Sequence, residues 1–464
     1  MHKSCVFRLL TASAAAALSV PAALAASPFV EPDVQVLNTL TAPAGEGFGW
    51  VAERIGDING DGAPEYLISS YPGDASGLYP GKVRVFDGRT GAVIRTYTGG
   101  AFQRLGFSVT GGQDVDGDGV PDYAYSAPSF RFTGELGHVY VRSGRTHEIL
   151  LDITREAGDL IGQDIAFAGD VDHDGHADLI IGAYTPPSQA LFGAGRVYLV
   201  SGRDGSTIWS HDGTVPGGLL GSGVTGLQDL NGDGVPEQAV GAFGEGHGGL
   251  AYILNGADGT TIRTLKPNGT AGAFGQFFVQ DPGDVDGDGV GDVLVGDYAD
   301  VRLGGSGRAY VFSGATDDRL RLVNGETGTD HLGEVRGAGD VDGDADADLL
   351  VGAYTSSAGG PTAGKCYLIS GKNGHVLRTF TATLPGASIG FDVVTLEDVN
   401  GDGLGDYLLT GVDVAYVVAG RPISGPGKKA LSSSADDGVD PRPCASFVSA
   451  DVDSGSPEGD PVCH

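Results

Sequence analysis

Residues 114–122 read DVDGDGVPD, and the chain repeats this acidic segment seven times along its 464 residues. Successive copies start 55 to 59 residues apart, at Asp57, Asp114, Asp170, Asp229, Asp284, Asp340 and Asp398. A period of this length indicates that one supersecondary unit recurs along the chain. The sequence therefore predicts a seven-fold repeat architecture.

Each copy has acid at its first, fifth and ninth positions and Asp or Asn at its third. Hard oxygen ligands at this close spacing suit calcium, so the pattern predicts up to seven Ca²⁺ sites. These positions hold 25 of the 60 acidic residues, and such crowded carboxylates repel one another without a cation. The expected ligands are Asp57, Asn59, Asp61, Glu65; Asp114, Asp116, Asp118, Asp122; Asp170, Asp172, Asp174, Asp178; Asp229, Asn231, Asp233, Glu237; Asp284, Asp286, Asp288, Asp292; Asp340, Asp342, Asp344, Asp348; and Asp398, Asn400, Asp402, Asp406.

Two other interpretations of these loops are less suitable. An EF-hand needs a Glu at position 12, where this chain has apolar or aromatic residues such as Ile68 and Tyr125. Plain Asx turns without metal would explain one loop, but not seven with acid at three fixed positions. The sixth loop has Ala345 in place of the turn glycine and an extra acid, Asp346, so we expect it to be the most distorted. His173 in the third loop, like His176, is expected to be an exposed residue and not a ligand.

The segments around each loop predict strands. An apolar-Gly pair such as Phe48-Gly49 comes about eight residues before the loop, and runs such as VLVGDY, GRVYLVSG and GHVLRTFTA follow it. Short runs rich in Val, Ile and Tyr between Gly and Asp clusters are typical of strands, and no stretch has helical periodicity. Four strands in each of seven units predict an all-β fold, a seven-bladed β-propeller.

The ends of the array predict how the ring closes. The seventh unit reaches DVAYVVAG and then continues as RPISGPGKKALSSS, which lacks the pattern of a fourth strand. An extra strand-like run, VQVLNTLTA at Val34–Ala42, precedes the first unit and resembles the fourth strands of the other units. We therefore expect the N-terminal run to complete the seventh blade.

The domain organisation predicted from the sequence has three parts. Residues 1–25 have a positive start, an Ala-rich apolar run and a small-residue cleavage site, which are typical of a secretory signal peptide. The propeller takes residues 26–420, and residues 421–464 are a flexible tail rich in Ser, Gly, Pro and Asp. The protein is thus expected to be secreted or at the cell surface.

Hydropathy, net charge and cysteine positions limit the kinds of partner that the protein can bind. No segment after the signal peptide is apolar enough to span a bilayer, and a formal charge of -32 argues against binding nucleic acid. Cys366 stands where other repeats have Val or Ala, so we expect a buried small side chain. Cys444 and Cys463 in the tail are candidates for a disulfide in an oxidising compartment.

Across residues 34–420 the sequence resembles the FG-GAP repeat family and the seven-bladed head of integrin α subunits. The pattern is Phe-Gly, an acidic calcium loop, Gly-Ala-Pro and then a Gly-x-Val-Tyr-Val strand. In this chain Gly-Ala-Pro is often altered, to Gly-Ala-Tyr at 182–184 and 352–354, and all seven loops carry the full ligand set. These departures resemble secreted bacterial relatives. The resemblance implies a calcium-loaded propeller that binds an extracellular ligand.

The sequence contains little that predicts catalysis. Residues 386–390 match G-x-S-x-G but lie in an all-β context without a following helix. We expect a binding or adhesion module for extracellular protein or glycan; the alternative is an extracellular polysaccharide lyase or hydrolase on the same ring. The contact face is expected opposite the acidic loops, on variable loops at 71–80, 128–136, 185–194, 243–248, 298–306 and 355–363. Candidate contacts on them are Tyr71, Tyr79, Phe130, Phe132, Phe192, Phe243, Tyr298, Arg131, Arg302, Glu135, Glu245, His247 and Asp300.

Overall fold

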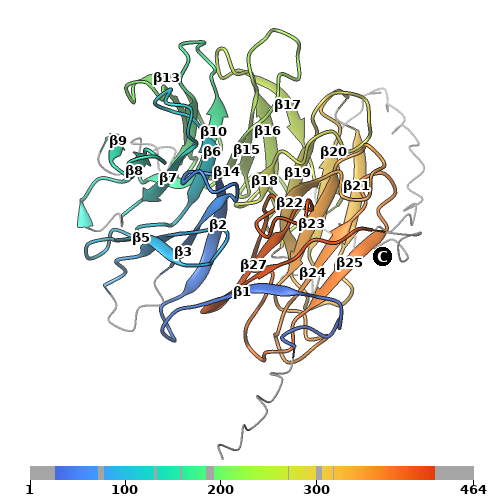
Figure 1. Cartoon of the computed structure of the whole chain (residues 1–464). Coiled ribbons are helices and arrows are strands. Elements are labelled where there is room, and N and C mark those ends of the chain that lie inside the picture. The colour runs from blue at the N-terminus through green and yellow to red at the C-terminus, as the bar shows by residue number, and fades with distance from the viewer. Residues whose placement is uncertain are drawn as a thin grey trace, which may run out of the picture. The chain divides into compact units, whose positions relative to one another are not determined.

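The computed structural model describes residues 27–71, 78–129, 133–156, 159–183, 193–269, 271–298, 306–316 and 318–423. Within these ranges the chain forms seven antiparallel sheets of four strands each (Figure 1). The fold is the predicted all-β seven-bladed propeller, in which the first strand of each unit lies innermost and contacts the inner strands of its neighbours.

The strands of the first three blades follow the repeat directly. Blade one contains β2 (Phe48–Gly56), β3 (Glu65–Ser70), β4 (Lys82–Phe86) and β5 (Val93–Thr98). Blade two contains β6 (Val109–Gln113), β7 (Asp122–Ala127), β8 (His138–Arg142) and β9 (Ile149–Thr154). Blade three contains β10 (Ile161–Gly169), β11 (Asp178–Ala183), β12 (Arg196–Val200) and β13 (Thr207–Asp212).

The next three blades repeat the same order. Blade four contains β14 (Leu220–Gly226), β15 (Gln238–Ala242), β16 (Leu250–Leu254) and β17 (Thr261–Leu265). Blade five contains β18 (Val279–Gln280), β19 (Val293–Asp297), β20 (Arg308–Phe312) and β21 (Arg319–Asn324). Blade six contains β22 (Leu332–Gly339), β23 (Asp348–Ala353), β24 (Lys365–Ile369) and β25 (Val376–Thr381).

The seventh blade joins the two ends of the described chain, as predicted. Its strands are β26 (Asp392–Thr395), β27 (Tyr407–Gly411), β28 (Val414–Val418) and, on the outside, β1 (Val36–Thr41). β1 pairs antiparallel with β28, with Leu40 opposite Ala415 and Val36 opposite Val418. The blue N-terminal strand can be followed beside the C-terminal strands in Figure 1.

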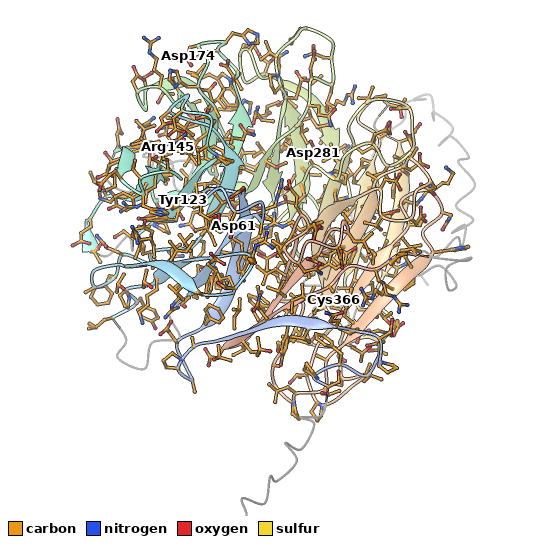
Figure 2. All side chains as sticks on the ribbon, in the orientation of Figure 1. Asp61, Tyr123, Arg145, Asp174, Asp281 and Cys366 are labelled. Carbon is orange, nitrogen blue, oxygen red and sulfur yellow. The ribbon has the colours of Figure 1, made fainter. Side chains whose placement is uncertain are left out.

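Apolar side chains fill the junctions between neighbouring blades. The buried residues fall into seven clusters, each built from two adjacent blades. Cys366 on β24 is fully buried in the cluster between blades six and seven (Figure 2), which confirms the prediction. The Gly of the apolar-Gly pair lets the backbones approach: a Cβ on Gly49, which has φ +91°, would lie 2.2 Å from the Gly411 carbonyl oxygen.

Some sequence predictions concern residues outside the described ranges. These are the signal peptide at 1–25, the tail from residue 424 onward and the Cys444–Cys463 pair. Among the described residues, no helix is long and apolar enough to cross a membrane.

Candidate metal centres and ligand face

The seven acidic loops are the hairpin connections between the first and second strands of each blade. They join β2 to β3, β6 to β7, β10 to β11, β14 to β15, β18 to β19, β22 to β23 and β26 to β27. The ninth loop residue is buried at the base of the second strand, with an exposed fraction of at most 1% in every copy. The first, third and fifth residues stay exposed or half-buried. Each loop therefore places three acidic or amide side chains above one buried carboxylate.

Backbone amides fix the buried carboxylate. In the second loop, Asp122 accepts hydrogen bonds from the Val115 N–H (2.7 Å) and from the Gly144 N–H (2.8 Å) of the turn after β8. The same pair of contacts recurs at Asp178, Asp292, Asp348 and Asp406. Burial raises the pKa of Asp122 to about 6 and that of Glu65 to about 7, because the charged form loses its hydration. A cation above this carboxylate would favour its ionised form.

The first residue of each loop folds the turn. Asp114 accepts hydrogen bonds from the backbone N–H groups of Gly117 (2.8 Å), Asp118 (3.2 Å) and Gly119 (2.8 Å). This is Asx-turn geometry, so the turn interpretation describes part of the loop correctly. In this turn, the other carboxylate oxygens of the loop point toward one another.

Those oxygens converge in most loops. Ligand atoms within 4.8 Å of one another are offered by Asp114, Asp116 and Asp122, and by the matching residues Asp170, Asp172, Asp178 and Asp284, Asp286, Asp292. Two further groups are Asp61, Glu65, Asp87 and Asp229, Asp233, Glu237. Asp87 is an addition to the predicted set; it lies on the turn after β4, and Thr90 and Gly91 bond to it. Such all-oxygen groups can hold a hard cation.

The donor set fits a cation in the sixth loop as well. The Oδ1 atom of Asp342 is buried and has no hydrogen-bond partner among the described residues, which is costly for a carboxylate. In the three loops with Asn at position 3, the structure turns the amide nitrogen toward the acids; for example, the Asn231 Nδ2–H donates to Glu237 (2.5 Å). An Asn that binds a cation must present its oxygen, whereas the Asn231 oxygen here accepts a hydrogen bond from the Asp233 N–H (2.8 Å), so the side chain would have to reorient.

The sixth loop keeps the common turn despite its substitutions. Ala345 adopts φ +74°, close to the φ +87° of Gly289 in the fifth loop, and its N–H bonds to Asp340 (2.9 Å). The extra acid, Asp346, pairs with Lys372 (3.0 Å) on the turn after β24. The departures from the repeat thus appear as local backbone strain and one ion pair, within the same loop shape.

The histidines of the third loop have different surroundings. His176 lies against the second loop, where its Nδ1 contacts the Val115 carbonyl oxygen (2.6 Å), and it is half-buried. His173 is exposed, as expected. Cations from neighbouring turns also touch the loops; Arg145, labelled with Asp61 and Asp174 in Figure 2, lies 2.6 Å from Asp118.

On the opposite face, aromatic side chains gather where the inner strands begin. Trp50 stacks on Tyr71 (ring centroids 4.4 Å apart) and lies 5.4 Å from Phe391 and 6.0 Å from Phe107. It also reaches Phe277 of the fifth blade, at 6.5 Å. We call the set Trp50, Tyr71, Phe107, Phe277, Tyr354 and Phe391 the aromatic cluster; all but Phe107 are half-buried. Half-exposed rings of this kind suit contact with sugars or with apolar protein surface.

The comparisons with known proteins match this geometry. A model of the FG-GAP repeat matches residues 162–200. Integrin alpha-PS2 of Drosophila melanogaster is 35% identical over 165 residues, which is 33% of this chain and 12% of that protein. Integrin alpha-2 of Mus musculus is 31% identical over 242 residues, covering 47% of this chain and 20% of that protein. The chain is an FG-GAP repeat protein, related to the β-propeller head of integrin α subunits.

The likeness to these relatives is partial in length. The matched regions span 12% to 20% of the integrins above, and 20% of integrin alpha-5 of Xenopus laevis, which is 27% identical over 217 residues. Among solved structures, a chain in the crystal structure of BBS1N in complex with ARL6DN matches with a TM-score of 0.52 and 10% identity. That match covers 84% of this chain and 98% of the other, and it supports the fold alone.

The predicted contact residues of this FG-GAP protein fall in different places. Tyr71 joins the aromatic cluster, and Tyr298 packs edge-on against Phe278 (5.9 Å) near it. Glu245 is buried and accepts a hydrogen bond from the Tyr252 hydroxyl (2.6 Å), which gives it a packing role. Tyr79, Glu135, Phe243 and His247 lie on described loops, whereas Phe130, Arg131, Phe132, Phe192, Asp300 and Arg302 lie outside the described ranges.

Prediction from variable loops missed the centre of the face. Trp50, Phe107 and Phe391 each directly follow the apolar-Gly pair of their unit, and Phe277 comes two residues after its own. Aligning the seven units on that pair would have placed Trp50, Phe107 and Phe391 in one column and Phe277 in the next. Every unit thus has an acidic loop at one end of its inner strand, and units one, two and seven have an aromatic residue at the other end.

Proposed function

We propose that this protein is a secreted, calcium-binding FG-GAP propeller that binds an extracellular protein or glycan through its aromatic face. The observation that carries this proposal is the aromatic cluster, half-exposed at the centre of the face opposite the acidic loops. Its rings come from blades one, two, five, six and seven, so the ring closure that assembles the propeller also assembles the contact surface. Related integrin α heads support a binding role over catalysis.

Calcium would act as a structural ion in this proposal. The four predicted ligands of each loop would hold one ion, with the buried ninth residue as its lower ligand and the Asx turn as its frame. The ion would offset the repulsion among clustered carboxylates and fix each hairpin. Because the loops lie at the other end of the inner strands, the ions would stabilise the aromatic face without contacting its ligand.

A retention assay tests the ligand face. The chain from residue 26, in millimolar calcium, is mixed with a panel of immobilised extracellular polysaccharides, and both retained protein and newly released chain ends are measured. Retention that is lost in Trp50→Ala and kept in Tyr140→Ala is the expected result. Tyr140 is a matched aromatic control, because it lies on the third strand of blade two beside His138.

The same assay separates the rival classes. Retention without new chain ends supports a glycan-binding module, and absence of retention by every polysaccharide directs the search to protein ligands. Release of new chain ends would contradict the binding proposal and support the lyase or hydrolase alternative. Equal retention of Trp50→Ala and the parent would show that the aromatic cluster is not the contact surface.

A further inference from the structure

A cavity of about 290 Å³ runs along the inner strands beneath the aromatic cluster. The residue five positions before each acidic loop is buried and pairs with the second strand of its blade; these residues are Ala52, Val109, Ile165, Val224, Val279, Val335 and Val393. Because side chains alternate along a strand, the residues six and four positions before each loop face the other way, toward the cavity. They form an upper and a lower level of its wall.

Three residues of the upper level connect neighbouring blades. Ser108 accepts a hydrogen bond from the Ile165 N–H of the next blade (3.2 Å), and Asp164 accepts one from the Val224 N–H (2.8 Å). Asp392 likewise accepts one from the Ala52 N–H (2.9 Å) across the ring closure. A short polar side chain at this position therefore links its blade to the following one. These contacts account for Asp164 and Asp392 without any ligand.

Glu334 occupies the same position in blade six and does not make this contact. It is 3% exposed and lines the cavity, yet its Oε2 atom has no hydrogen-bond partner among the described residues. Its side chain is one methylene longer than Asp, and the Val393 N–H of the next blade already donates to Asp392 (2.8 Å). When ionised, a buried carboxylate without a partner is strongly unfavourable, so a cation beside Glu334 would be favourable.

The nearby cation, Arg336, lies between other carboxylates, and its Nε atom also has no hydrogen-bond partner among the described residues. Arg336, on the lower level, lies 3.6 Å from both Glu53 and Asp392. With Asp164 and Glu334, four carboxyl groups thus share one guanidinium around this cavity. The aromatic rings of Trp50, Phe107, Phe277 and Phe391 form the rest of the wall, and their faces attract cations.

We propose that this cavity binds a small organic diamine, with Glu334 as the counter-ion of one ammonium group and the aromatic cluster against its alkyl chain. A bare metal ion suits the site less, because it would lie beside the Arg336 guanidinium and would leave most of the volume unfilled. An ammonium group matches a buried carboxylate, and methylene groups match aromatic walls.

The cavity is reached from the side of the acidic loops. A second cavity of about 410 Å³ shares Glu53, Gln280 and Arg336 with the first and continues past residues 337–339 and 394–397 toward the loops. Asp281, labelled in Figure 2, adds a carboxyl group at its rim, where Glu397 is paired with Arg54. At the other end of the cavity, the Trp50 ring packs against Phe391 and Phe277. A chain with a formal charge of -32 attracts small cations to this opening.

Protonation would compete with the diamine. Burial, with Asp392 as a neighbouring acid, raises the pKa of Glu334 well above its ordinary value. Burial likewise raises the pKa of Asp164, to about 7, and those of Glu53 and Asp392. Arg336 is the positive group that faces Glu334, Asp164 and Asp392, and both Arg336 and Arg54 face Glu53. Binding of an ammonium group at Glu334 therefore releases a proton, and the affinity should increase as the pH rises toward 8.

Fluorescence of Trp50 provides the test. The chain has two Trp residues, so a Trp209→Phe background leaves Trp50, in the cavity wall, as the sole reporter. This protein is titrated with 1,4-diaminobutane in millimolar calcium, which keeps the acidic loops occupied, and in parallel with 1,4-butanediol, the neutral analogue. A saturable change with the diamine, and none with the diol, is the expected result.

Two variants assign the response to Glu334. Glu334→Gln is expected to weaken diamine binding at least ten-fold, whereas Glu148→Gln, which removes an exposed carboxylate on an outer turn, leaves it unchanged. The melting curve of Glu334→Gln without diamine shows whether it folds; if it does not, the diamine-against-diol comparison on the parent decides alone. No saturable response, an equal response to the diol, or equal affinity in a folded Glu334→Gln would overturn the proposal.

Discussion

Removal of the N-terminal strand should open the ring. Deleting residues 27–42 takes away β1 and the buried side chains Phe29, Val34 and Leu40, which are 3%, 8% and 6% exposed. Full burial of such side chains contributes roughly 1.5–3 kcal/mol each, so the loss is about 5–9 kcal/mol before the hydrogen bonds to β28 are counted. Stabilities of folded proteins are typically about 5–15 kcal/mol. The truncated chain is therefore expected to lack a cooperative melting transition at the temperature of the parent.

A point variant gives the graded form of this prediction. Leu40→Ala should cost about 2–4 kcal/mol for a buried Leu. At about 2.1 cal/mol/K per residue over roughly 400 residues, unfolding entropy is about 0.8 kcal/mol/K, so the melting temperature should fall by about 3–5 °C. Calorimetry in calcium measures both effects, and Leu384→Ala, at a 49% exposed Leu, serves as the control. A truncated protein that melts like the parent would refute this account of ring closure, as would failure of a peptide of residues 27–42 to restore the transition.

Three further perturbations test the loops and the channel. Removal of calcium by a chelator should lower the free energy of unfolding by about 5–13 kcal/mol. Each of seven sites with a dissociation constant of about 10⁻⁴–10⁻³ M contributes about 0.7–1.8 kcal/mol at roughly 2 mM calcium. An unchanged melting temperature in chelator would contradict the metal assignment. Ala345→Gly should raise the free energy of unfolding by about 1 kcal/mol in denaturant titrations, because it relieves the strain of φ +74°. Gly289→Ala, where a Cβ has open space at φ +87°, should lower it by a similar amount. If both variants were as stable as the parent, backbone strain would be excluded. With a folded pKa raised above its unfolded value, Glu334 binds more protons in the native state, so its contribution to stability declines as pH rises from about 4.5 through the folded pKa. Melting in calcium should therefore show Glu334→Gln gaining on the parent between pH 5 and pH 8, and a constant difference would mean that Glu334 is already ionised.

The fold could be predicted because every unit repeats the same loop and strand patterns. The acidic loops gave the period, the flanking β-branched runs gave the strands, and Val34–Ala42 supplied the missing strand of the last unit. Ring closure was predicted by counting strands, since the last unit lacked its fourth strand and radial repetition of complete blades leaves only short edges. No long-range contact had to be inferred beyond pairing of the first strand with the last.

The ligand face was harder to predict because it depends on which inner-strand residues point inward. The contact face was predicted on the variable loops because their lengths differ. Of the aromatic residues predicted there, only Tyr71 and Tyr298 have described contacts at or near the aromatic cluster. The centre is formed instead by Trp50, Phe107 and Phe391, residues in the regular part of the repeat. Their meeting requires the ring geometry, which brings residues more than 300 positions apart in sequence into contact.

Equivalent positions of the seven repeats can be compared with one another, and this comparison makes Glu334 informative. At the position six residues before the loop, Ser108, Asp164 and Asp392 each bond to the backbone of the next blade, so a polar residue there has a structural explanation by default. Glu334 has the same position and similar chemistry but lacks that contact, and its oxygen lies buried in the cavity that its neighbours share. A residue that lacks the structural contact made by equivalent residues in other repeats is a good indicator of function. The acids of the loops are less informative in this respect, because all seven copies share them. Aligned repeats thus separate the polar residues that bond to the next blade from Glu334, which does not.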